Sequence, residues 1–261
     1  MKIHEILLDS AKYPLLNLKS LFSLGFLILI GSFLLSRYFD LNQLFGYEIG
    51  ITGTLIITLI SFLALAVATI LESGYTFKII EESLNGTKKP PKLNKYIHMF
   101  KHGINEIVIG LIYFLIPIII SIVILDTLLT QINFGLPSLS ESAVIIFIII
   151  FLILLFISDI LFTVSIPYMA SKGGKFKEAF RIIEILRKIK QIGLKRLLIG
   201  YLVVVLGIVA VGWPILEEII ESANIFGFVI AELVIAPYIL IFYARFTALI
   251  YKSHSSSDTI N

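Results

Sequence analysis

The sequence predicts an all-α, polytopic integral membrane protein: a bundle of six transmembrane helices, with amphipathic in-plane helices on the cytoplasmic side. Three observations predict this fold. First, 58% of the 261 residues are hydrophobic and only 15% are charged, against about 45–50% and about 25% in soluble domains. Second, the hydrophobic residues gather in six long runs. Third, basic residues occur in alternate connections. Cysteine is absent, which excludes disulfides and thiolate sites.

Each of the six runs is long enough to cross a bilayer, since about 20 apolar residues span about 30 Å of hydrocarbon. The runs lack the alternation of barrel strands, so we expect helices. The predicted spans are 21–39, 49–71, 107–125, 143–167, 197–216 and 225–250. The first lacks a small-residue cleavage site, so we interpret it as an uncleaved span. We expect one membrane domain, 1–252, and a disordered polar tail, 253–261.

The basic residues predict the orientation. Lys and Arg concentrate before the first span, in the second and fourth connections, and at the end of the chain, while the third and fifth connections have none. The positive-inside rule therefore places both termini and the two basic connections on the cytoplasmic side of the plasma membrane. Each basic connection is too short to bury its own core, so any activity belongs in or on the membrane.

The fourth connection predicts one basic amphipathic helix lying flat in the membrane interface, near anionic headgroups. Its polar stripe is Lys177, Arg181, Glu184, Lys188 and Gln191, and its apolar face is Phe176, Ala179, Ile183 and Leu186. Gly173-Gly174 permits the turn into that plane. A purely structural elbow is the alternative.

The second connection has a predicted helix stop at Asn85-Gly86, and Pro90-Pro91 excludes helix beyond it. A second short helix is expected from about Asn94. The candidate surface for lipid headgroups or a partner comprises Lys88, Lys89, Lys92, Lys175, Lys177, Arg181 and Lys188.

The starts of the odd spans resemble one another. The segment Gly103–Gly110 is similar to Gly193–Gly200 and, more loosely, to Leu18–Gly25. This pattern is consistent with three copies of a two-helix hairpin, related by an axis along the membrane normal. Chance similarity between apolar helices is the alternative.

Several short motifs resemble those of a family of polytopic archaeal membrane proteins, domain of unknown function number 4013. They are Tyr13-Pro14, Lys19, Gly25, Gly74-Tyr75, Lys78, Leu84, Gly86, Pro91, Phe100, Gly103, Pro237-Tyr238, Tyr243 and Arg245. The segment after Gly86 departs from the family pattern, because it is basic rather than acidic. The resemblance implies a multi-pass membrane protein and no assigned activity.

Charged residues inside the spans are the sharpest functional candidates, since each costs about 2.5–3.5 kcal/mol at a helix centre. They are Asp159, Glu232 and Arg245. We hypothesise an Asp159–Arg245 ion pair between the fourth and sixth spans. The alternative is an Arg245 that extends to the interface and a separately hydrogen-bonded Asp159. Glu232 has no basic residue at its depth, which suits either a proton or cation relay or a hydrogen bond to a neighbouring helix.

Other patterns are weaker. Pro117, Pro214 and Pro237 interrupt spans, as in transporter sites but also in ordinary membrane helices. His98, His102 and Glu106 share a helix face and could approach a metal, although such a pattern is more often a polar stripe. We expect no metal site, no cofactor and no nucleic-acid partner. The motifs of phosphate-binding loops, zinc proteases and serine hydrolases are absent.

The sequence thus favours a non-enzymatic membrane scaffold or lipid-organising component, which acts through its basic cytoplasmic segments on anionic headgroups. The alternative is a small transporter or channel that uses Glu232 and Asp159 for proton or cation coupling. An intramembrane enzyme ranks third, for want of a catalytic pair. A cavity shared by the two acids would favour transport.

Overall fold

The computed structural model describes residues 2–35, 51–134, 141–207 and 226–253. Every regular element in these ranges is a helix, and five of their helical segments are long and apolar enough to cross a membrane. The prediction of an all-helical membrane protein is therefore confirmed. The predicted fifth span continues past residue 207, and residues 208–216 and the polar tail from 254 lie outside the described residues.

The chain begins with α1 (Ile3–Lys12), the 3₁₀ turn η1 (Tyr13–Asn17) and α2 (Leu18–Leu35). The helix α4 (Ile51–Leu84) ends at the predicted stop, where Gly86 adopts a left-handed φ of +88°. The next helix, α5 (Tyr96–Phe134), starts after an irregular segment and runs without a break into the third span. The helix expected from about Asn94 therefore begins at Tyr96 and is continuous with the third span.

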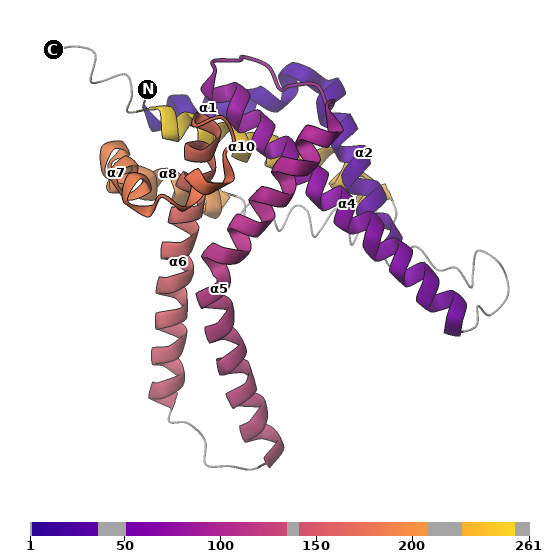
Figure 1. Ribbon diagram of the computed structural model, residues 1–261, viewed down its shortest axis with the longest axis vertical. Helices are drawn as coiled ribbons and strands as arrows, with labels where there is room; N and C mark the ends of the chain where they lie inside the picture. The colour runs from indigo at the N-terminus through magenta and orange to yellow at the C-terminus, as the bar shows by residue number, and fades with distance from the viewer. Residues whose placement is uncertain (1, 36–50, 135–140, 208–225, 254–261) are drawn as a thin grey trace.

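The helices α5 and α6 (Glu141–Ser171) form a long antiparallel hairpin that projects away from the rest of the molecule, while α2 and α4 project in another direction (Figure 1). Exposed apolar side chains cover the projecting parts, including Leu111–Leu125 on α5 and Ile145–Ile157 on α6. Such surfaces are suited to contact with lipid. The buried core instead gathers where the helices converge, around Tyr75, Phe77 and Met99.

After the predicted turn at Gly173 and Gly174, both with positive φ, the structure departs from the expected single amphipathic helix. The 3₁₀ turn η2 (Phe176–Phe180) and the helix α7 (Ile182–Ile192) are separate, because Arg181 has a non-helical backbone with ψ of 71°. The predicted apolar face is consequently split: Ala179 is buried, whereas Ile183 is 74% exposed. The side of α7 that packs inward carries Ile185, Ile189 and Ile192.

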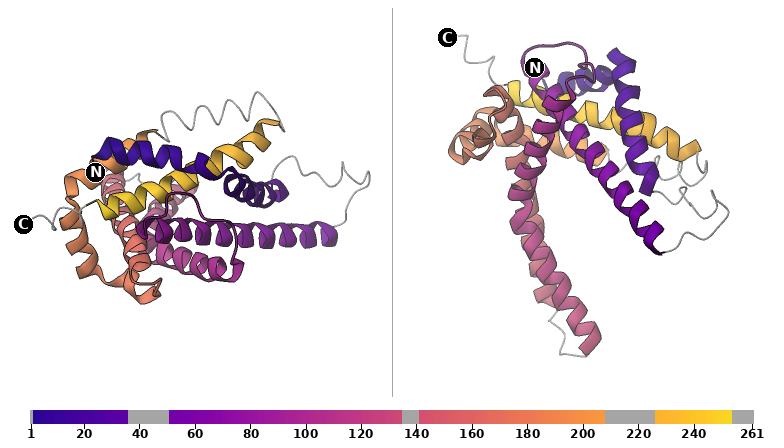
Figure 2. Two further views of the ribbon diagram at one scale, coloured as in Figure 1. Left: turned by 90° about the horizontal axis from the view of Figure 1, so that it is seen from above. Right: turned by 45° about the vertical axis from the view of Figure 1, so that its right-hand side comes forward.

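The last part of the described chain comprises α8 (Leu194–Gly207) and a continuous helical segment, Phe226–Lys252. This segment contains the π-helical turn η4 (Ala231–Ile235) followed by α10 (Ala236–Lys252). Pro237 explains the turn, since it has no N–H to donate to the Leu233 carbonyl four residues earlier. Figure 2 shows α10 crossing beneath α1 and beside α4.

Glycines allow two helix pairs to approach closely. On α4 and α5, a Cβ at Gly74 would collide with the Met99 carbonyl and one at Gly103 with the Ile70 carbonyl. The two contacts are reciprocal, so each helix presses a glycine against the backbone of the other. A Cβ at Gly25 of α2 would similarly strike the Leu233 carbonyl, the same carbonyl that Pro237 leaves without its helical donor.

Candidate functional site

The Asp159–Arg245 pair hypothesised from the sequence is wrong. The Arg245 guanidinium donates instead to the Asp9 carboxylate on α1, with an Nε–Oδ1 distance of 2.8 Å, and to the Thr87 carbonyl at 3.0 Å. It also lies over the Tyr13 ring, 4.5 Å from the ring centroid. Arg245 is only 6% exposed, so it is a buried anchor of the protein's packed end.

The Arg245 contacts belong to a larger set that holds residues 85–95, the loop between α4 and α5. Six side chains donate hydrogen bonds of 2.7–3.0 Å to its backbone carbonyls: Tyr13, Asn17, Ser20, Tyr75, Lys78 and Arg245. Within this loop, Pro90 and Pro91 are buried. We call this assembly the loop cradle. Several residues that carry the family resemblance meet here, which gives them a shared structural role.

The basic residues predicted as a headgroup or partner surface do not form one continuous patch. Lys88, Lys89 and Lys92 are exposed on the loop cradle, above α1 and α2. Lys175, Lys177 and Arg181 are exposed on the separate segment around η2, and Arg181 pairs with Glu178 at 3.3 Å. Lys188 turns inward, with its ammonium 4.6 Å from the centroid of the Tyr251 ring.

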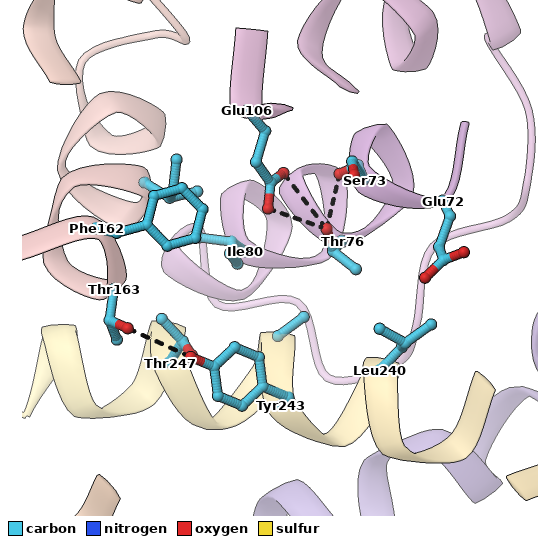
Figure 3. A pocket seen from close by; sticks show the side chains of 12 residues that line it. Glu72, Ser73, Thr76, Ile80, Glu106, Phe162, Thr163, Leu240, Tyr243 and Thr247 are labelled. Atoms are coloured by element: carbon cyan, nitrogen blue, oxygen red, sulfur yellow. Dashed lines mark hydrogen bonds between the residues drawn. The ribbon is translucent and has the colours of Figure 1, made fainter. Parts of the chain in front are cut away.

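A cavity of about 180 Å³, with carboxyl and hydroxyl groups on largely apolar walls, lies where α4, α5, α6 and α10 converge (Figure 3). We call it the acidic cavity. Its walls comprise Glu72, Ser73, Thr76 and Ile80 from α4, Glu106 from α5, Phe162, Thr163 and Ile166 from α6, and Leu240, Tyr243, Ala244 and Thr247 from α10. Two carboxyl groups face this space and no lining residue is basic. The cavity has room for about six water molecules, at roughly 30 Å³ for each.

The hydrogen bonds around the acidic cavity leave oxygen atoms available. The Thr76 hydroxyl donates its one proton to the Ser73 carbonyl at 2.7 Å, so its two 3.4 Å contacts with the Glu106 oxygens are weak. Tyr243 and Thr163 share a longer hydroxyl–hydroxyl bond of 3.3 Å. The Thr247 hydroxyl has no hydrogen-bond partner among the described residues, although Thr247 is only 4% exposed.

The two acids predicted from the sequence flank the acidic cavity rather than line it. Asp159 is close enough to Tyr201 to interact with it, and Tyr201 lies close to the wall residue Tyr243. On the other side, Glu232 lies in the π turn, near Ser32, and is close enough to Glu72 for electrostatic interaction. Polar side chains thus lead from each predicted acid to the cavity.

The acidic cavity lies within the apolar part of the molecule. On α5, exposed apolar residues occur both before Glu106, at Phe100 and Ile104, and after it, from Leu111 to Leu125. Along the same helix, Glu106 is about 30 Å from Asp126, which is about the thickness of the hydrocarbon layer. Glu106 therefore lies at about the end of the hydrocarbon layer, and its place between packed helices makes an unpaired charge costly there.

The three residues weighed as a metal site are directed differently. The His102 ring stacks on Phe77, with ring centroids 4.4 Å apart, and its centroid is 4.3 Å from that of His98. Glu106 turns to Thr76 and the acidic cavity. Within the described ranges, no group of three or more His, Asp or Glu side chains could hold a metal ion.

Sequence reasoning did not select Glu72 and weighed Glu106 only as a metal ligand, because both acids of the cavity wall lie just outside the predicted spans. A local signal does mark them. Glu72 lies two residues before Gly74, and Glu106 lies three residues after Gly103. The glycines that bring α4 and α5 together also bring these acids to one level.

Comparison with curated proteins and with solved structures gave no significant match. A family model does match residues 56–217, more than half of the chain. The matched region includes Glu72, Glu106 and Asp159, together with the loop cradle's segment 85–95. The chain thus belongs to the family described as protein of unknown function DUF4013.

Proposed function

We propose that this protein is a small cation-handling membrane protein, a transporter or channel component, and that the acidic cavity binds the cation or proton. The observation that carries the proposal is the cavity itself: Glu72 and Glu106 face one space between the helices that has no basic lining residue. The sequence favoured a scaffold. The geometry favours the transport alternative, because a scaffold does not require a polar space inside an apolar bundle.

The chemistry of the walls supports a cation rather than an anion or an apolar ligand. The polar groups offered by Glu72, Glu106, Ser73, Thr76, Thr163, Tyr243 and Thr247 are all oxygens, the ligand type that hard cations prefer. When they are ionised, two carboxyl groups without a basic neighbour create a negative potential that repels anions. The Thr247 hydroxyl, which belongs to the cavity wall and has no hydrogen-bond partner among the described residues, supplies a further oxygen.

The flanking acids fit a route through the protein. Asp159, by way of Tyr201 and Tyr243, and Glu232, by way of Glu72, give the cavity polar neighbours on two sides. The role proposed for these two acids is to pass a proton or cation to and from the cavity.

Ion flux in liposomes tests the proposal. The full chain would be reconstituted, and uptake of Na⁺, K⁺ and protons would be measured for the wild type and for Glu106→Gln. Loss of a charge-assisted contact costs about 1.5–3 kcal/mol, so we expect flux of the transported ion to fall by about tenfold or more. Glu81→Gln is the control, since Glu81 lies on α4, the helix that carries Glu72, but outside the cavity wall.

Equal flux through wild-type, Glu106→Gln and protein-free liposomes would overturn the cation-handling role. Flux lost equally in Glu106→Gln and Glu81→Gln would show that the carboxyl groups of the cavity have no special part in it.

A scaffold or lipid-organising role is the second candidate, and one observation favours it. Around α7, exposed Lys and Arg side chains adjoin exposed Ile183 and Leu186, a combination that suits an in-plane helix at an anionic interface. Under this proposal the protein is non-enzymatic, and its partners are anionic headgroups at the cytoplasmic face. Its test is whether charge reversal on α7 disperses the protein in cells while flux remains unchanged.

Both candidates share a proposed topology. The chain would cross the plasma membrane six times, with both termini in the cytoplasm, and the three hairpins would be repeats. Single cysteines introduced into this cysteine-free chain test it. A cysteine at Lys89 should react with an impermeant reagent only from the cytoplasmic side, and one at Tyr47 only from outside.

A further inference from the structure

A second, open hollow of about 540 Å³ runs along the membrane-facing side of α2, away from the acidic cavity. Its lining residues are Lys19, Phe22, Ser23, Phe26, Leu27 and Ile30 of α2, with Leu93 from the loop before α5 and Tyr96 at the start of α5. We call it the α2 groove. We propose that the α2 groove holds one anionic phospholipid, with its phosphate on Lys19 and an acyl chain along the phenylalanines.

The length of the α2 groove fits one lipid leaflet. Lys19, Phe22, Phe26 and Ile30 follow one another at helical spacing, so they form a single stripe along α2. From Lys19 to Ile30 the stripe is about 16 Å long, which is about half of the ~30 Å hydrocarbon layer. Phe22, Phe26 and Ile30 are each 45–59% exposed, so an acyl chain has side chains to pack against.

The depth of Lys19 fits a headgroup. The next residue, Ser20, donates a hydrogen bond to the Pro91 carbonyl of the loop cradle at 2.8 Å, so Lys19 lies level with that loop. The apolar stripe starts there and leads away from the loop. A cation at the loop end of an apolar groove matches the order of a phospholipid, phosphate first and acyl chain second.

The charge around the α2 groove selects an anionic lipid. Lys19 is exposed and forms no ion pair with any described side chain. Lys92 and Lys95 are exposed and adjoin the lining residues Leu93 and Tyr96 in the sequence. No lining residue is acidic. A zwitterionic headgroup would gain little from this positive potential, whereas a net negative headgroup gains from each basic residue.

Native mass spectrometry of the purified full chain tests the proposal. Phosphatidylglycerol and phosphatidylcholine would be added in equal amounts, and retained lipids counted. We expect preferential retention of one phosphatidylglycerol, reduced about fivefold by Lys19→Ala. Lys12→Ala, which removes an exposed lysine of α1 outside the groove, should leave the preference unchanged. Inorganic phosphate should not compete, because it has no acyl chain.

A photoreactive phenylalanine analogue in place of Phe26 tests whether the lipid binds in the α2 groove. In vesicles of equal parts of the two lipids, we expect it to crosslink phosphatidylglycerol in excess, while the same group at Leu55, which is 66% exposed on α4, should crosslink both lipids equally. Equal crosslinking at both positions, competition by inorganic phosphate, or an equal loss in Lys12→Ala and Lys19→Ala would overturn the proposal.

Discussion

Arg245 and Thr247 are both buried on α10, two residues apart, yet only the polar group of Arg245 has hydrogen-bond partners. Arg245 has a carboxylate, a carbonyl and an aromatic ring around its guanidinium. Thr247 has a hydroxyl without a partner among the described residues. Since buried polar groups are normally paired, the first residue is expected to contribute to stability and the second to ligand binding.

The Arg245–Asp9 contact predicts a specific pattern of coupling. We expect Arg245→Met to lower the free energy of unfolding by about 2 kcal/mol, because hydrogen bonds to charged groups are worth about 1.5–3 kcal/mol. Asp9→Asn should cost less, about 1 kcal/mol, because the Asp9 side chain is 41% exposed. Thermal unfolding in detergent measures both. A double-mutant cycle that couples Arg245 to Asp159 rather than to Asp9 would contradict this structure.

Thr247→Val separates folding from binding. Without a suitable cation, we expect this variant to be as stable as the wild type or about 1 kcal/mol more stable, since it removes an unpaired buried hydroxyl. The extra stability that a bound cation gives the wild type should shrink. Thr163→Val is the control: it breaks the bond to Tyr243 and should lower stability by about 1 kcal/mol. The same cation-induced shift of the unfolding temperature in Thr247→Val and wild type would exclude the hydroxyl from binding.

At the scale of elements, the α4–α5 crossing depends on two glycines, and α5 provides its own control. Gly103→Ala would place a methyl group against the Ile70 carbonyl, whereas at Gly110 the nearest atom to an added Cβ is a Phe162 ring carbon at 3.5 Å. We expect Gly103→Ala to lose about 3 kcal/mol of stability by overpacking, and Gly110→Ala to be nearly neutral. Unfolding temperatures of the two variants compare them directly, and equal losses would show that the crossing is not tight.

Helix ends were readable from the sequence, but backbone irregularities were not. Gly86 and the Gly173-Gly174 pair end their helices where predicted, because positive φ favours glycine. The only sequence signal for the π turn at Ala231–Ile235 is Pro237. A proline predicts that the helix is interrupted, but it does not predict that the interruption is a π turn. The break at Arg181 has no local signal at all: the segment keeps helical spacing through it, and packing of Ile185 and Ile189 decides the register.

At the scale of the whole molecule, composition and hydrophobic runs predicted a helical membrane protein, because the bilayer requires long apolar helices. The partner of Arg245 could not be predicted, since Asp9 is 236 residues away in the sequence. Nothing in the sequence indicates which acidic residue of a distant helix lies beside a given arginine. The acidic cavity was predicted only in part. The acids selected from the sequence, Asp159 and Glu232, lie beside it, whereas Glu72 and Glu106 on its walls were not selected because they lie at the ends of the spans.

The apolar length of α5 has a consequence for where this protein can work. Its exposed apolar side chains run from Ile104 to Leu125, about 32 Å along the helix axis, so α5 fills a ~30 Å hydrocarbon layer and a thinner bilayer creates a hydrophobic mismatch. We expect thermal stability and cation uptake to rise together across phosphatidylcholines of increasing acyl-chain length, because thin bilayers force α5 to tilt at the Gly103 crossing. If neither quantity changed with acyl-chain length, bilayer thickness would have no effect on the α4–α5 crossing. Bilayer thickness would thus act on Glu106, one turn beyond that pivot, and cell membranes of different thickness would set different activities for the same protein.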